Sequence, residues 1–186
     1  WATTAAVTGT YTIKVMPLVF SPAAGTYSQT QAVTLTSPTA GALIRYTTDG
    51  TTPSATVGIE LANGGTIAVD RTMSVRAIAY KPGWAPTTAV SATYTMRAAT
   101  PTLSPAPGTY TTAQTVAIGS ASSGALIRYT TDGTMPSETA GTELANGGTI
   151  VVDASMTVKA IAYRPGWTNS VVVSGVYIYN PPLTGS

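Results

Sequence analysis

The chain has 186 residues, with nine Lys and Arg, seven Asp and Glu, no His and no Cys. Without His there is no Ser-His-Asp or Cys-His nucleophile system and no imidazole metal site, and without Cys there is no disulfide framework, zinc ribbon or iron–sulfur cluster. A net charge of +2, with 9% charged residues, gives no electrostatic footprint for nucleic acid. No apolar run approaches the roughly 20 residues of a membrane span. We therefore expect no cofactor, no nucleic-acid partner and no membrane insertion.

The composition favours an all-β protein. The chain contains 36 Thr, 18 Gly and 13 Pro. Thr, Val and Tyr with frequent Gly and Pro are typical of short strands joined by turns. At 44% hydrophobic residues the chain is too apolar for a disordered linker.

Residues 1–16 resemble the end of a repeat. Val7 and Tyr11 stand where two later segments also carry Val and Tyr, so residues 1–13 are interpreted as the closing strand of a repeat whose body is absent from the sequence. Unpaired, such a strand exposes apolar side chains and a sheet edge. Three interpretations remain open. The chain is an excerpt of a longer array, or Val7, Tyr11 and Ile13 add to a sheet of a neighbouring subunit and so mediate self-association, or the end is frayed.

Two complete repeats follow. GALIRYTTDGT at 41–51 recurs at 124–134 after a step of 83 residues, and the same step separates other repeated segments, such as PGW at 82–84 and 165–167. Fixed-period similarity of this kind indicates adjacent domains with one fold. We expect domains over 17–97 and 98–180, and a tail over 181–186.

Within a repeat, the pattern predicts about seven short strands. A Pro/Gly turn, SPAAGTY at 21–27, precedes an alternating strand in which Val33 and Leu35 share the buried face. The later expected elements are a strand over 42–48, a turn at Asp49–Gly50, a turn at 63–65, a long strand over 74–80 and a closing strand over 89–95. This succession predicts a small antiparallel β-sandwich.

The motifs SPAAGTY, LIRYTTDGTTPS, VRAIAYKPGW and VSATYT, in this order, resemble the chitobiase/β-hexosaminidase C-terminal-type repeat, also called an Fn3-associated domain. The resemblance covers both repeats and residues 1–13. It implies tandem Ig- or fibronectin-III-like sandwiches in a secreted bacterial protein, extracellular or at the cell surface, that have no catalytic role of their own. It assigns no ligand.

Six acidic residues occupy equivalent positions in the two repeats and are candidates for a site. We expect Asp49 and Asp132 to accept backbone N–H bonds at turns and the other acids to be solvated loop charges. A calcium site is the weaker alternative, because Asp-Gly-Thr lacks the dense acidic spacing of a calcium loop. Catalysis by paired carboxylates is not expected. The calcium candidates are Asp49, Glu60, Asp70, Asp132, Glu143 and Asp153.

Four aromatic residues beside turns are candidates for carbohydrate binding, since an exposed ring can stack on a sugar. They are Trp84, Trp167, Tyr27 and Tyr110. The interpretation we favour over carbohydrate binding is that each ring covers an open end of a small sandwich whose core lacks bulk, because the chain has one Phe.

The sequence therefore predicts a non-enzymatic structural protein: β-sandwiches joined end to end in an extracellular rod, stalk or filament, with neighbouring copies or further repeats as partners. The alternative function is a carbohydrate-binding accessory module of a secreted polysaccharide-degrading enzyme or an adhesin, with cell-surface polysaccharide as the partner.

Overall fold

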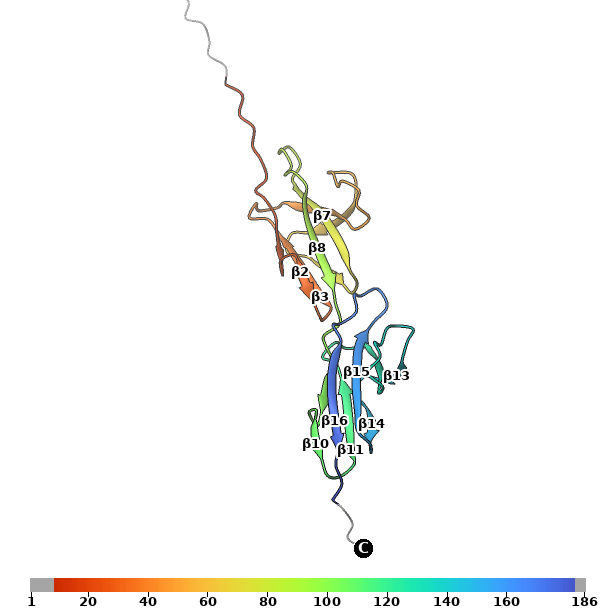
Figure 1. The fold of residues 1–186 in the computed structure, drawn as a ribbon. Coiled ribbons are helices and arrows are strands. Elements are labelled where there is room, and N and C mark those ends of the chain that lie inside the picture. The colour runs from red at the N-terminus through yellow and green to blue at the C-terminus, as the bar shows by residue number, and fades with distance from the viewer. Residues whose placement is uncertain (1–8, 183–186) are drawn as a thin grey trace, which may run out of the picture. The chain divides into compact units, whose positions relative to one another are not determined.

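The computed structural model describes residues 9–182, which contain β-strands and no helix (Figure 1). The first repeat holds β1 (Val19–Ser21), β2 (Gly25–Tyr27), β3 (Gln31–Thr36), β4 (Leu43–Thr47), β5 (Ile59–Ala62), β6 (Thr66–Val69), β7 (Met73–Tyr80) and β8 (Val90–Met96). The second repeat holds β9 (Thr102–Ser104), β10 (Gly108–Tyr110), β11 (Gln114–Gly119), β12 (Leu126–Thr130), β13 (Thr142–Ala145), β14 (Gly148–Val152), β15 (Met156–Tyr163) and β16 (Val173–Tyr179). The all-β prediction is confirmed, and the described part of the chain has no helix that could span a membrane.

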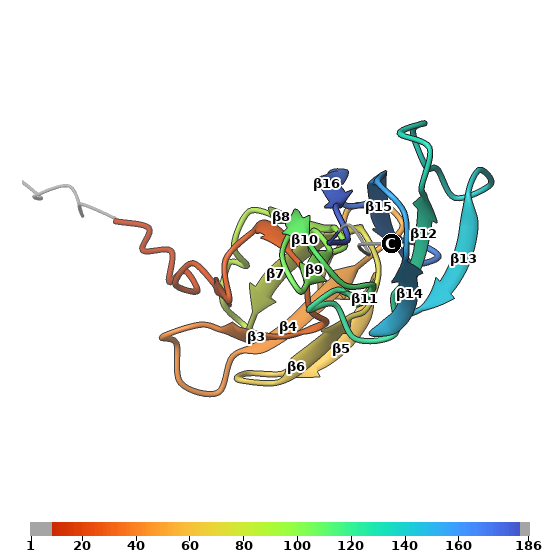
Figure 2. The ribbon, with the colours of Figure 1, turned by 60° about the horizontal axis from the view of Figure 1, so that its bottom comes forward.

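Each repeat forms a three-stranded and a five-stranded sheet. In the first repeat the strand orders are β1-β3-β6 and β2-β8-β7-β4-β5, and in the second they are β14-β11-β9 and β10-β16-β15-β12-β13. Figure 2 shows β13 beside β12 at the edge of its sheet. Two sheets that each bury one face form a β-sandwich, as the sequence predicted.

Alternation along the strands produces the buried core. Val33 and Leu35 of β3 are fully buried, as are their counterparts Val116 and Ile118 of β11. The core of the second repeat continues with Ile127 and other residues of the five-stranded sheet. Burial of these apolar side chains is the main stabilising contribution to each sandwich.

One strand pair in each repeat differs from the antiparallel prediction. The segment expected to be only a turn contains β2, which pairs in parallel with β8 in the register Gly25↔Tyr94 to Tyr27↔Met96. The pair β10 and β16 repeats this arrangement. A three-residue strand inside a Pro/Gly turn has no local signal, because its pairing partner lies at the other end of the repeat.

The chain divides into two compact units. The first contains the described residues up to Ala24, then Ala32–Val69 and Met73–Thr93. The second contains Gly25–Gln31, Asp70–Thr72 and the chain from Tyr94 onward. The second unit thus includes the second repeat and three segments of the first.

Residues 9–13 form no strand, in contrast to the predicted closing strand, and Figure 1 shows them as a trace without an arrow. Just after this segment, Lys14 forms an isolated parallel bridge with Ala85. It is supported by bonds from the Ala85 N–H to the Ile13 carbonyl and from the Val15 N–H to the Ala85 carbonyl, both at 2.9 Å.

Candidate functional site

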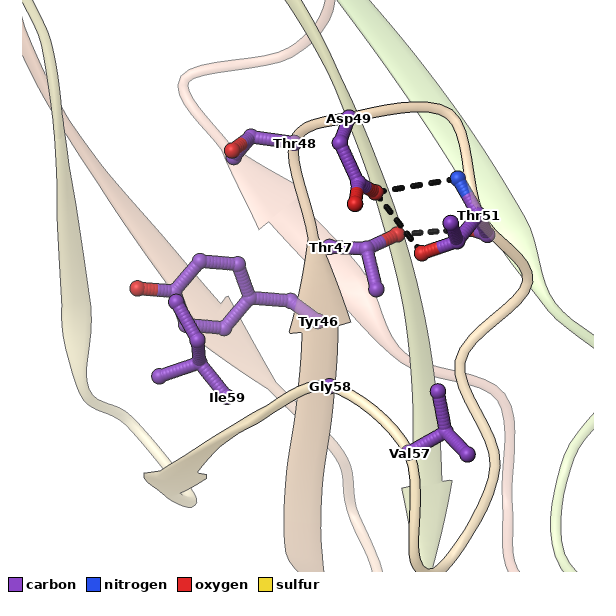
Figure 3. Close-up of a pocket in the computed structure, with 8 residues that line it drawn as sticks. All are labelled: Tyr46, Thr47, Thr48, Asp49, Thr51, Val57, Gly58 and Ile59. Carbon is purple, nitrogen blue, oxygen red and sulfur yellow. Dashed lines mark hydrogen bonds between the residues drawn. The ribbon is translucent and has the colours of Figure 1, made fainter.

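A pocket of about 380 Å³ lies at the end of β4, where the chain turns at Asp49. Figure 3 shows the ring of Tyr46 beside Ile59, its register partner on β5, and the Asp49 carboxylate directed toward Thr51. The other lining residues are Thr47, Thr48, Val57 and Gly58. The lining thus offers an aromatic ring, threonine hydroxyls and one carboxylate, and it lacks the pair of carboxylates that glycoside hydrolysis uses.

Gly58 lines this pocket at a position that requires glycine. Its φ is 107°, and a Cβ there would lie 2.7 Å from the carbonyl oxygen of Tyr46. Gly141 repeats both features. The corresponding pocket of the second repeat measures about 360 Å³ and contains Thr142 where the first has Ile59. The two pockets are equivalent in backbone but differ in polarity.

The Asp49 carboxylate supports the turn. Its Oδ1 accepts bonds from the Thr51 N–H at 3.0 Å and the Thr51 hydroxyl at 2.7 Å, and these bonds hold the pKa of Asp49 below its usual value. Asp132 makes the same bonds with Thr134, and its pKa is lowered for the same reason. The turn role predicted for these two acids is thus present in the structure.

Glu60 and Glu143 are exposed, but they lie on strands and pair with neighbouring side chains, so the expectation that they are loop charges is wrong. Glu60 lies on β5 and accepts from Arg45 Nη2 at 2.9 Å and from the Tyr80 hydroxyl at 2.5 Å. The bond from the phenol to Glu60 raises the pKa of Tyr80. In the second repeat, Glu143 joins Arg128 and Tyr163 in the same way. The recurrence of Arg, Glu and Tyr at fixed spacing in both repeats is the signal that could have predicted these contacts.

The remaining acids are not gathered at one site. Asp70 lies 3.7 Å from Arg71, with both side chains largely exposed, and Asp153 is exposed. Within residues 9–182, no three acidic side chains are grouped so as to hold a metal ion. The structure therefore does not bring the six calcium candidates together.

The two tryptophans occupy equivalent turns in different surroundings. Each has a cation over its ring, Lys81 Nζ at 4.7 Å from the centroid of Trp84 and Arg164 at 4.6 Å from that of Trp167. Trp84 is partly exposed, whereas Trp167 is 7% exposed and its Nε1 donates to the carbonyl of Asp70 at 2.7 Å. Of these two tryptophans, Trp84 is the more exposed and is the one whose side chain a ligand could reach.

Tyr27 and Tyr110 are half-buried beside the closing strands. Tyr27 lies 6.1 Å from Tyr94 between ring centroids, and Tyr110 lies 6.2 Å from Tyr177. The Tyr110 hydroxyl donates to the Ala106 carbonyl at 2.6 Å. These rings pack against the fully buried tyrosines of the sandwich and do not lie in the pocket at Asp49.

The self-association candidates lie before the first sandwich. Val7 is outside the described residues, Tyr11 is 93% exposed, and Ile13 is 56% exposed. The side chains of Tyr11 and Ile13 are thus accessible.

Comparison with solved structures finds similarity, at low sequence identity, to several chains. The fibronectin(III)-like modules of Clostridium thermocellum CbhA are 11% identical, with 91% of this chain and 97% of that chain covered and a TM-score of 0.36. A chimeric titin Z1Z2 is 8% identical, with 92% and 100% covered and a TM-score of 0.35. The human OSCAR ligand-binding domain is 13% identical, with 88% and 99% covered and a TM-score of 0.31. No curated protein sequence matches the chain.

The family comparison follows the internal repeat. The family described as "Chitobiase/beta-hexosaminidase C-terminal domain" matches residues 22–93 and again residues 105–174. Each match begins at the turn before the second strand of a repeat and reaches into its closing strand. The chain therefore belongs to the chitobiase/beta-hexosaminidase C-terminal domain family and carries two copies of that domain.

Proposed function

We propose that the chain is a non-catalytic structural module of a secreted bacterial protein, in which tandem sandwiches act as an extracellular rod, stalk or filament. The observation that carries this proposal is that carboxylates of both repeats are engaged in the same structural bonds. Asp49 and Asp132 hold turns, while Glu60 and Glu143 join neighbouring strands. A carboxylate engaged in this way is poorly placed to act as a general acid or base.

Assembly through residues 1–13 is the second part of the proposal. Tyr11 and Ile13 are exposed and precede a bridge that fixes Lys14 beside Ala85. Within the described residues, 9–13 form no strand and expose Tyr11 and Ile13, and such a segment is suited to adding a strand to a sheet of another sandwich.

Two measurements test the structural role. Electron microscopy of native material should show fibres with a repeat of one or two domains, and isolated monomers would contradict a filament. Hydrolysis assays on chitooligosaccharides and aryl glycosides should give no turnover. Turnover that is abolished by Glu60→Gln plus Glu143→Gln would contradict the non-catalytic role.

Carbohydrate binding is the second candidate function, and the pocket at Tyr46 favours it. Tyr46 provides a ring beside the hydroxyls of Thr47 and Thr48, and Trp84 provides a partly exposed indole elsewhere in the repeat. Aromatic faces with a few polar groups are the usual elements of a small-ligand site.

Glycan-array and polysaccharide pull-down experiments distinguish the two functions. Under the second candidate, Tyr46→Ala or Trp84→Ala should remove binding, whereas the matched change Tyr129→Ala tests the second pocket. Absence of binding by the unaltered chain would leave the structural role as the only one of the two.

A further inference from the structure

The surface around Trp167 is covered within the second unit. Trp167 Nε1 donates to the carbonyl of Asp70 at 2.7 Å, and the Thr72 N–H donates to the carbonyl of Gly166 at 3.2 Å. A Cβ on Gly166 would lie 3.3 Å from the Cβ of Arg71. Residues 70–72 therefore seal this turn with backbone groups and leave little space beside it.

Ser122 extends the same contact. It is fully buried, and its hydroxyl donates to the carbonyl of Ser28 at 2.8 Å while accepting from the Ala99 N–H at 2.8 Å. We call Ser122, Gly166 and Trp167 the Trp167 face. Three of its groups thus bond to residues 28 and 70–72.

The first repeat carries the same groups at Thr39, Gly83 and Trp84, here called the Trp84 face. The turn has the same geometry, because the Trp84 N–H donates to the Lys81 carbonyl at 3.0 Å as the Trp167 N–H does to Arg164. Yet a Cβ on Gly83 would have no heavy atom within 4 Å, and no residue of 9–182 accepts a bond from Trp84 Nε1. Among the described residues, none covers the Trp84 face as residues 28 and 70–72 cover the Trp167 face.

We propose that the Trp84 face, together with residues 9–13, docks another sandwich of the second repeat's type. The proposal rests on the structural role proposed above and names the partner for it. In such a sandwich, Thr111, Asp153 and Ser155 stand 83 residues after Ser28, Asp70 and Thr72. The expected bonds use backbone groups of residues 111, 153 and 155. They therefore do not depend on the replacement of Ser28 by Thr111 or of Thr72 by Ser155.

The docking end of the second repeat is already formed. The Tyr179 N–H donates to the Ser155 hydroxyl at 3.0 Å, as the Met96 N–H does to Thr72. Asp153, Ser155 and Thr111 are all exposed. The residues whose carbonyl and N–H groups the Trp84 face requires are thus exposed at this end. One contact has no counterpart. The Gln29 side chain donates to the Ala121 carbonyl, but the residue equivalent to Gln29 in the second repeat is Thr112, whose side chain is shorter.

Gly9 specifies which type of sandwich residues 9–13 fit. Gly175 of β16 contacts Pro107 so closely that an added Cβ would collide with the proline ring and lie 2.8 Å from Leu103 Cδ1. The first repeat has Ala92 and Ala24 at these two positions. Residues 9–13 carry Gly9 in this place, although a Cβ there would meet nothing closer than 3.5 Å. A strand with Gly at this position suits a sandwich with Pro at the position of Pro107.

Tyr11 completes the match. Its counterpart Tyr177 is fully buried and donates to the Pro105 carbonyl at 2.8 Å, whereas Tyr11 is almost fully exposed. A sandwich closed by residues 9–13 would bury Tyr11 in the same way. Gly9 and Tyr11 thus have the same two-residue spacing as Gly175 and Tyr177 of β16.

The two parts of the surface are held together. In the second unit the Thr168 N–H donates to the Met96 carbonyl at 2.7 Å, which fixes the end of a closing strand beside Trp167. In the first unit the Ala85 N–H donates to the Ile13 carbonyl at 2.9 Å beside Trp84. If residues 9–13 close another sandwich, the end of that sandwich that carries the residues equivalent to 111 and 153–155 therefore faces the Trp84 face.

The test extends the present chain before Trp1 with a copy of residues 101–166, so that residues 1–13 occupy the place of 167–179. Trp1→Phe and Trp167→Phe leave Trp84 as the only tryptophan in both the extended and the present chain. In the extended chain, acrylamide quenching of Trp84 should fall severalfold and its emission should shift to shorter wavelength. It should match Trp167, measured in the present chain with Trp1→Phe and Trp84→Phe.

Matched variants identify the contact. Gly83→Asn has space in the present chain, and Asn tolerates a positive φ, so this change should restore quenching in the extended chain without unfolding it. Gly9→Ala should destabilise the added sandwich, and Pro→Ala at the copied position 107 should reverse that loss. A second extension made from residues 18–83 should also protect Trp84 and should tolerate Gly9→Ala.

Unchanged quenching of Trp84 in both extensions would overturn the proposal. It would also be overturned if chitooligosaccharides, and not the added sandwich, protected Trp84 from quenching. If the chain neither hydrolyses nor binds glycans, and Trp84 stays accessible in both extensions, the docking proposal is wrong but the structural role stands.

Discussion

Arg45 of β4 and Glu60 of β5 face each other in register and join their side chains at 2.9 Å across the strand pair. The second repeat keeps the same pair as Arg128 and Glu143 at 3.0 Å. The carboxylates that a search for glycosidase chemistry would select are therefore part of the sheet surface.

The free energy of this ion pair should be small. A double-mutant cycle with Arg45→Ala and Glu60→Ala should give a coupling of about 0.5 kcal/mol in urea unfolding, because Glu60 keeps 46% of its side chain exposed to solvent. The matched pair Asp70 and Arg71, at 3.7 Å and more exposed, should give a coupling near zero. A value for Arg45 and Glu60 above about 2 kcal/mol would contradict a surface interaction.

The phenol of Tyr80 should titrate late. The hydrogen bond to Glu60 raises its pKa and so favours the neutral phenol in the folded chain. The stabilising contribution is fully present below the unfolded pKa of about 10 and is lost as pH rises through the folded pKa. Glu60→Gln should lower the pKa of Tyr80, as measured by ultraviolet difference titration. Tyr163, bonded to Glu143, should be unaffected and serves as the control.

The Asp49 turn should respond to acid in the opposite direction. The bonds from Thr51 lower the pKa of Asp49, so their contribution is present above the unfolded pKa of about 3.9 and is lost as pH falls through the folded pKa. Thr51→Val should raise the pKa of Asp49, as measured by carboxyl-carbon NMR. Thr48→Val, at an exposed neighbour, should leave that pKa unchanged, and an equal rise in both variants would refute the role of the Thr51 hydroxyl.

Gly175 and Pro107 should be energetically coupled. Gly175→Ala should destabilise the second repeat by about 1–3 kcal/mol, because the added methyl group overpacks against the proline ring. Combining it with Pro107→Ala should recover most of that loss, since the first repeat contains Ala at both positions. Thermal unfolding monitored by calorimetry provides the measurement. Equal losses in the single and double variants would show that the proline is not the cause.

Local patterns were sufficient for much of the fold and for part of the site. Alternation correctly placed Val33 and Leu35 in the core, and Asp followed by Gly correctly marked the turn at Asp49. Both features depend on residues within a few positions of each other, so the sequence contains the necessary information.

Features that depend on distant residues were not predicted. β2 pairs in parallel with β8 across most of a repeat, and Glu60 meets Tyr80 from a strand two places away in the sheet. The burial of Trp167 depends on Asp70, which is still further away in the chain. None of these contacts follows from the residue types next to them.

The parallel pairing of β2 with β8 has a mechanical consequence. β2 lies near the start of its repeat and β8 ends it, so tension applied along the chain pulls the two strands in opposite directions along their common axis. The hydrogen bonds between Gly25–Tyr27 and Tyr94–Met96 are then loaded together in shear, whereas in an antiparallel hairpin pulled from its open end they would break one after another. β10 and β16 give the second repeat the same arrangement. Each sandwich thus contains a short clamp oriented to resist stretching of the chain.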